Sequence, residues 1–138
     1  MDTRLRRELM ARLNGDAAVI AARFGLRYRV IEPERPRVKR RYGVCFSDGT
    51  IRIRLAHAKT GEPLRYSSLV ATLCHELAHL RHFNHGQRFR AFNQTLLEWA
   101  RSRGIYRPRS PRRAQLEPIV EPCAPRPIES PRQLSLFG

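Results

Sequence analysis

The residues of this chain best suited to chemistry are two histidines one helical turn apart and a glutamate between them. The segment 74–79 reads CHELAH and lies in a mostly apolar stretch from Ser67 to about His82. A helix that is apolar on all sides is a buried helix. At 3.6 residues per turn, His75 and His79 project from one face of that helix, so their imidazoles can bind one metal ion.

The glutamate of this segment has a different task from the histidines. Glu76 is offset from them by about 100 degrees around the helix, so we do not expect it to bind the metal. It can instead act as the general base that deprotonates a water molecule. Histidines at this spacing also occur by chance, but burying two of them with a carboxylate among leucines and alanines costs several kcal/mol unless they are paired or metal-bound. The burial therefore favours a metal site.

A catalytic zinc site needs a third protein ligand besides the open position for water. The remaining candidates are His57, His82 and His85. His82 shares the face of the pair but lies about 10 Å along the axis from His75. His85 requires the chain to turn after the helix. Asn84 suits such a turn, and Gln87 gives a capping-box-like start to the next helix. We prefer His85, with His82 and His57 as alternatives.

The hydrophobic spacing predicts the elements that must position these residues. Leu5, Leu9 and Leu13 predict a helix that ends at Asn14-Gly15, and Asp16 can cap a second short helix that ends at Gly25. Alternation predicts a strand over 26–30 and a loop over 32–36. It also predicts a hairpin around Asp48-Gly49, with apolar residues on one face and arginines on the other. A stripe of core residues predicts an amphipathic helix from Gly86 to Arg103, namely Phe89, Phe92, Leu96 and Trp99.

Composition limits the class of protein and its partners. The chain has 138 residues and a formal net charge of +15, which favours nucleic acid as a polyanionic partner over a merely solubilising surface. No apolar run approaches the ~20 residues of a membrane span, and the N-terminus is not a secretory signal. Its 3 cysteines imply no disulfide framework, so we expect a cytoplasmic protein.

The prolines divide the chain into a domain and a tail. Seven of its 10 prolines fall between residues 108 and 131, where they forbid a regular helix. The sequence therefore predicts a globular domain over 1–103 and an extended or disordered tail over 104–138. Arginines before the hairpin and along the last helix and tail could grip phosphates without reading bases, namely Arg40, Arg41, Arg101, Arg103, Arg107, Arg109, Arg112 and Arg113.

The metal motif resembles that of a known family. The HELAH segment at 75–79, followed by Asn84-His85-Gly86 and Phe89, resembles the signature of the SprT/Spartan-like and WLM metalloproteases and of the YgjP-like metallopeptidases. The segment 41–45, RYGVC, matches a strand of the YgjP-like group, although Tyr42 replaces its usual tryptophan. The resemblance covers about residues 38–100.

This resemblance implies a fold and an activity. The fold would be α+β, a small antiparallel sheet packed against the helix that bears the histidines, with zinc in the cleft between them. His75, His79 and His85 would bind Zn²⁺, and Glu76 would be the catalytic base. The chain would then be a zinc metalloendopeptidase that cuts unfolded protein segments with little sequence preference.

The end of the tail resembles a second known motif. Gln133, Leu134, Leu136 and Phe137 match all four specified positions of the peptide that binds the bacterial sliding clamp. Leu136 and Phe137 would be apolar anchors in a groove of the partner.

Together these features predict a function. We expect a metalloprotease that is recruited to DNA through the sliding clamp and degrades proteins bound or crosslinked there, in the cytoplasm and associated with the nucleoid. One alternative is a general cytoplasmic peptidase of the YgjP-like kind. The other is a clamp- and DNA-binding accessory protein without catalysis, which would not need Glu76.

Overall fold

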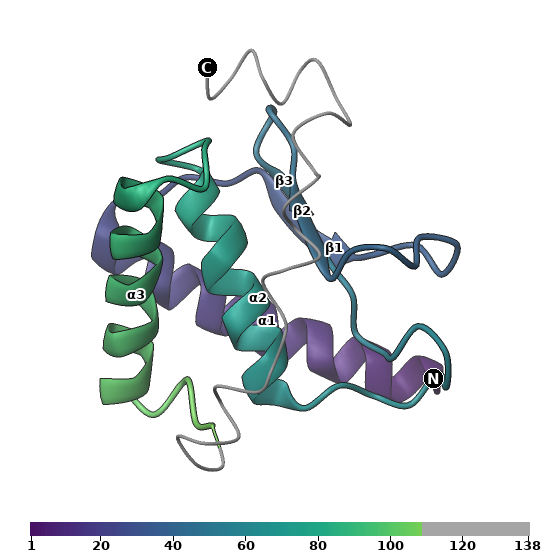
Figure 1. Ribbon diagram of the computed structural model, residues 1–138. Coiled ribbons are helices and arrows are strands. Elements are labelled where there is room, and N and C mark those ends of the chain that lie inside the picture. The colour runs from purple at the N-terminus through teal and green to yellow at the C-terminus, as the bar shows by residue number, and fades with distance from the viewer. Residues whose placement is uncertain (109–138) are drawn as a thin grey trace.

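The computed structural model describes residues 1–108, which form three helices and a small sheet (Figure 1). The predicted α+β class is confirmed. The predicted clamp motif at 133–137 and Arg109, Arg112 and Arg113 lie outside the described residues. The domain boundary at 103 stays a prediction. Past it, Ile105 and Tyr106 still pack against the core, and the N–H groups of both donate to the carbonyl of Ala100.

The first helix, α1, runs without a break from Thr3 to Phe24, so the predicted end at Asn14-Gly15 is wrong. The buried residues Leu13, Ala17 and Ile20 follow one another at spacings of four and three and form one stripe on the core. Burying that stripe outweighs the roughly 1 kcal/mol that a helical glycine costs. The helix ends as predicted at Gly25, whose backbone is left-handed with a φ of 67°.

The three strands form one sheet in the order β1-β3-β2. Its strands are β1 (Val30–Pro33), β2 (Gly43–Cys45) and β3 (Thr50–Ile53). The hairpin is confirmed, because β2 and β3 pair antiparallel. However, β1 pairs parallel with β3, so the sheet is mixed rather than antiparallel throughout. The first strand also starts later than predicted and includes Pro33, which an edge strand tolerates.

The second helix, α2 (Tyr66–His79), is the centre of the molecule. Figure 1 shows it crossing in front of α1, with α3 (Gln87–Ser102) on one side and the sheet on the other. Every residue from 69 to 79 is buried, as the apolar sequence predicts. The predicted stripe of α3 also faces the core, and its Phe92 and Trp99 pack edge-to-face on Phe24 at ring distances of 5.9 and 5.8 Å.

None of the helices within residues 1–108 is both long enough and apolar enough to be a candidate membrane span.

Candidate metal centre

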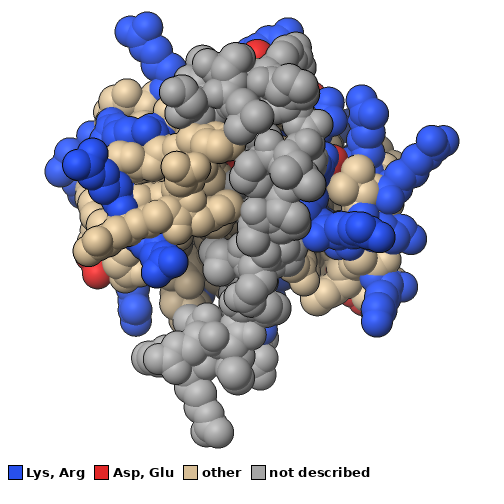
Figure 2. Space-filling view, turned by 45° about the horizontal axis from the view of Figure 1, so that its top comes forward, with Lys and Arg blue, Asp and Glu red and all other residues tan. Residues whose placement is uncertain are grey.

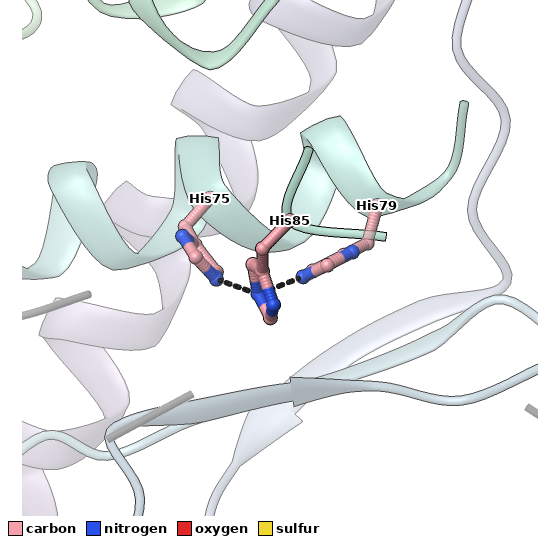
Figure 3. A group of neighbouring side chains, drawn as sticks. All are labelled: His75, His79 and His85. Carbon is pink, nitrogen blue, oxygen red and sulfur yellow. Dashed lines mark hydrogen bonds between the residues drawn. The ribbon is translucent and has the colours of Figure 1, made fainter. Parts of the chain in front are cut away.

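Three imidazoles converge on one point beside α2. His75 and His79 come from the last turns of α2, and His85 comes from the link between α2 and α3 (Figure 3). The Nε2 atom of His85 lies 3.0 Å from Nε2 of His79 and 3.2 Å from Nε2 of His75. These are the residues that the sequence singled out, and in the described chain they form the group able to hold a metal ion.

The link between the helices delivers His85 by a route that differs from the predicted one. After α2 the N–H groups of Arg81 and His82 both donate to the carbonyl of Ala78, which tightens the turn. The Arg81 guanidinium donates to the carbonyl of Phe24 at 2.6 Å and so anchors the link to the end of α1. No non-glycine residue in 1–108 has a positive φ, so Asn84 does not adopt the expected left-handed backbone.

The start of α3 also differs from the prediction. The N-cap residue is Gly86, in extended backbone and without a side-chain cap, instead of Asn84 with a capping box from Gln87. The position of His85 therefore depends on contacts with other helices and not on a local capping motif.

His82 supports the cluster through its backbone. Its carbonyl oxygen lies 3.1 Å from Nδ1 of His79, while its own ring packs against Phe92. A carbonyl only accepts, so Nδ1 of His79 carries a proton and, in the neutral ring, Nε2 keeps its lone pair for the cluster. Metal-binding histidines are commonly oriented by such a partner. His57, the other alternative ligand, lies exposed on the loop after β3, outside the cluster.

Phe89 of α3 packs against all three imidazoles. Its ring lies 4.9 Å from that of His75, 4.4 Å from that of His79 and 5.0 Å from that of His85. The helical spacing predicted Phe89 as a core residue and the family-like motif included it, but neither showed which side chains it would touch. Here the phenyl ring is an apolar wall that keeps the imidazoles in place and limits their access to water.

The donor set fits a divalent transition metal. A single proton on His85 Nε2 can be donated to His75 or to His79, but it cannot satisfy both at once. A cation attracts all three lone pairs together, and burial of His75 and His79 makes that attraction worth more than it would be in water. Imidazole nitrogens suit zinc, and three protein ligands leave one coordination position for water or substrate.

Glu76 lies on the sheet side of α2 and is fully buried. A Cβ atom at Gly43 of β2 would be only 3.1 Å from Oε2 of Glu76 and 2.7 Å from Cγ2 of Thr72. The backbone of β2 therefore lies directly against the carboxylate. In the sequence Gly43 is part of the family-like strand, and the structure shows the physical reason for a glycine there.

The buried thiol next to the cluster belongs to the core. Burial raises the pKa of Cys74 to about 12, so this side chain is a neutral thiol at physiological pH.

The described basic residues of the prediction lie in two places. Arg40 and Arg41 are on the loop before β2. Arg101 is in the last turn of α3, Arg103 is its C-cap, and Arg107 lies on the segment that follows. Some of them already have internal contacts. Arg41 donates to the buried Glu34 at 2.8 Å, and Arg107 donates to the carbonyl of Gly104.

The comparisons with known proteins agree with this geometry. The family model described as YgjP-like, metallopeptidase domain, matches residues 1–104. The chain belongs to the YgjP-like family. Among solved structures, the fold of this YgjP-like chain is similar to that of Wss1 from Saccharomyces cerevisiae, with a TM-score of 0.63 and 20% identity over 70% of this chain and 79% of Wss1.

A mutant of the same yeast protein matches equally well. Its TM-score is 0.64, with 19% identity over 72% of this chain and 82% of the mutant. No curated protein matches the chain. At such identities the yeast structures show that the fold is shared, while the family match shows that the YgjP-like chain carries a metallopeptidase domain.

The close approach of β2 to α2, at Gly43 and Thr72, can be tested by adding one methyl group. We expect Gly43→Ala to lower the free energy of unfolding by about 1–3 kcal/mol, because the new Cβ would overlap the methyl group of Thr72. Thr72→Ser removes that methyl group, so the double variant should recover part of the loss. Urea unfolding of the two single variants and the double variant measures the coupling. Strictly additive losses would contradict the contact.

Proposed function

We propose that this chain is a zinc-dependent endopeptidase in which His75, His79 and His85 bind the metal and Glu76 is the catalytic base. The observation that carries the proposal is the convergence of the three imidazoles beside a buried carboxylate. The match to a metallopeptidase domain supports hydrolysis of peptide bonds as the use of this arrangement.

The residues of the site divide the work of peptide hydrolysis. When bound, zinc polarises the scissile carbonyl and lowers the pKa of water to near 7. Glu76 then accepts a proton from the attacking water and returns it to the nitrogen of the leaving amine. The hydrogen bond from His79 to the His82 carbonyl holds one imidazole in the orientation this requires.

Strand β2 is suited to align the substrate. It is an outer strand in the order β1-β3-β2, and it packs on α2, the helix that bears Glu76. A substrate held extended alongside such a strand by main-chain hydrogen bonds would be bound with little sequence preference. Because Gly43 of β2 contacts Glu76, a peptide bound there would run past the base.

The proposed substrates are proteins bound or crosslinked to DNA, which places the enzyme at the bacterial nucleoid in the cytoplasm. The net charge of +15 supports DNA as the polyanion, bound without sequence preference. The resemblance to Spartan-like proteases supports protein attached to that DNA as the substrate. The competing proposals are a general YgjP-like peptidase with an incidental basic surface, and an accessory protein that binds the clamp and DNA without catalysis.

Zinc content tests the ligand assignment. We expect the full-length chain to retain about one equivalent of zinc through dialysis, and His75→Ala, His79→Ala and His85→Ala each to lose it. His82→Ala is the matched control, because its contribution to the site is a backbone carbonyl that alanine keeps. Metal analysis with circular dichroism to verify folding gives the result. Loss of zinc in His82→Ala but not in His85→Ala would refute the assignment of the third ligand.

Glu76→Gln tests the catalytic role. The substitution keeps the size of the side chain but removes the base, so we expect cleavage of a DNA-crosslinked protein to fall about 10²–10⁴-fold with zinc retained. Gel analysis of product over time measures the rates.

The same assay separates the competing proposals when it is run on the crosslinked protein and on the free protein. Equal rates for wild type and Glu76→Gln would exclude the catalytic role. Equal cleavage of the free protein would favour the general peptidase. Bound zinc without any cleavage would favour the accessory protein.

Recruitment by the sliding clamp is a proposal that rests on the sequence at 133–137. Deleting residues 133–138, or changing Leu136 and Phe137 to alanine, should abolish binding to a bacterial sliding clamp, because the apolar anchors are removed. Ser135→Ala is the control, since position 135 is unspecified in the motif. Surface plasmon resonance measures the affinity, and unchanged binding after the deletion would rule out this mode of recruitment.

A further inference from the structure

A second candidate site lies next to the metal centre, in a basic pocket between the loop before β2 and the loop after β3. The pocket has a volume of about 420 Å³, and its lining within residues 1–108 contains no acidic residue. Its cationic lining residues are Lys39, Arg40, Arg41, Arg54 and Lys59. One of the two groups of blue side chains that flank the molecule in Figure 2 lies on the right, where Figure 1 shows these loops.

Arg54 sets this pocket apart from an ordinary charged surface. It is only 8% exposed, and it lines the pocket. Its Nη2 atom donates to the carbonyl of Val38 at 2.6 Å, and its guanidinium lies 5.4 Å from the centre of the Tyr42 ring. No carboxylate within residues 1–108 forms an ion pair with it. Glu34 attracts this guanidinium but makes no ion pair with it, and its direct contacts are a neutral carbonyl and an aromatic ring. A buried guanidinium in such surroundings is stabilised when an anion joins it.

The buried carboxylate nearby is already engaged by other groups. Oε2 of Glu34 accepts from Arg41 at 2.8 Å, and its Oε1 accepts from the backbone N–H of Arg35 at 3.0 Å. Two largely buried guanidiniums, those of Arg41 and Arg54, therefore share one carboxylate in the described chain. Burial lowers the pKa of Arg54 from its ordinary value through desolvation, and the attraction of Tyr42 and Glu34 offsets only part of that shift.

The geometry suits a phosphate. The guanidinium of Arg54 has N–H groups besides Nη2, and a planar guanidinium can grip two phosphate oxygens at once. Lys39, Arg40 and Lys59 are exposed around the mouth of the pocket and add charge without the cost of burial. Tyr42, also in the lining, offers a ring on which a base can stack. An acidic peptide would use the charge but not the ring, so the lining favours a nucleotide chain.

The pocket is joined to the metal centre through β2. Tyr42 directly precedes Gly43, the residue that lies against Glu76. Arg54 directly follows Ile53, which is paired with Gly43 in the sheet. The basic pocket therefore lies at one end of β2, and Glu76, the proposed base, lies against the same strand.

We propose that the basic pocket around Arg54 binds the phosphate backbone of nucleic acid, with Arg40 and Lys59 at its mouth each contacting a phosphate, and so holds DNA at the end of the substrate strand. The choice of DNA as the source of the phosphate rests on the proposed function. The binding itself does not depend on proteolysis. DNA bound in this pocket would present an attached protein to β2 and Glu76. The basic residues of the pocket would then form a defined binding site for DNA.

Two matched pairs of substitutions in the full-length chain test this proposal. Arg40→Gln with Lys59→Gln removes two exposed charges from the pocket, so folding should be retained. Arg23→Gln with Arg27→Gln removes two exposed charges from the end of α1 and the turn after it, and neither residue lines the pocket. Both variants have the same net charge.

Fluorescence anisotropy with a labelled single-stranded oligodeoxynucleotide gives the affinity as a function of salt. Each phosphate contact to a single strand contributes a slope of about 0.7 in log affinity against log salt. For the pocket variant, we expect the slope of this plot to become shallower by about 1.4 and the affinity at 0.1 M salt to fall about 25-fold. Both changes should be far smaller in the control variant. Equal losses in both variants would show diffuse attraction and overturn the proposal.

Further arms identify the anion. Inorganic phosphate should raise the melting temperature of the wild type more than that of Arg54→Gln. Repeating the anisotropy measurement with a duplex tests binding to double-stranded DNA. Binding of a poly-glutamate peptide as tightly as the oligonucleotide would overturn the assignment to nucleic acid. If the wild type binds no DNA, the DNA part of the proposed function fails too. If it binds DNA equally with and without the pocket charges, only the pocket fails.

Discussion

The structure depends on holding the Nε2 atoms of His75 and His79 within 3.2 Å of that of His85, in a poorly hydrated place. Such an arrangement is unfavourable for neutral rings alone, because a single proton on His85 cannot be donated to both of the other rings at once. The fold opposes this cost with packing. Helix α2 is buried from residue 69 to 79, Phe89 contacts all three rings, and Arg81 ties the link that bears His85 to the end of α1. A metal ion would convert the repulsion into binding energy.

Close approach between a strand and a helix is the second requirement. Glu76 can act on a peptide only if the strand that aligns the peptide lies near it, and Gly43 permits this because it has no side chain. The same strand is an outer strand of the sheet, so the element that lies against Glu76 is paired with β3 and packed on α2. The mixed sheet makes this possible, since β1 covers the other side of β3 and leaves β2 at the edge next to α2.

The charged residues of this chain differ in how strongly their interactions affect stability and binding. Exposed ion pairs such as Arg4 with Glu8 contribute little, because water screens them. Arg54 differs because it is buried, and the nearby carboxylate of Glu34 is already engaged by Arg41. Composition suggests a polyanionic partner. However, the net charge does not tell an exposed guanidinium, which water solvates, from a buried one, which an anion would stabilise. Only burial makes that distinction, which is why Arg54 was not among the basic residues predicted from the sequence.

The features that could be predicted from the sequence are those that depend on neighbours along the chain. It placed His75, Glu76 and His79 on one buried helix, the hairpin around Asp48-Gly49 and the end of α1 at Gly25, because backbone geometry sets these spacings locally. Tertiary structure decided the rest. It brought His85 rather than His82 to the pair, carried α1 through Gly15 and paired β1 with β3. These outcomes depend on contacts between segments far apart in the sequence, whose packing energies exceed local preferences of about 1 kcal/mol.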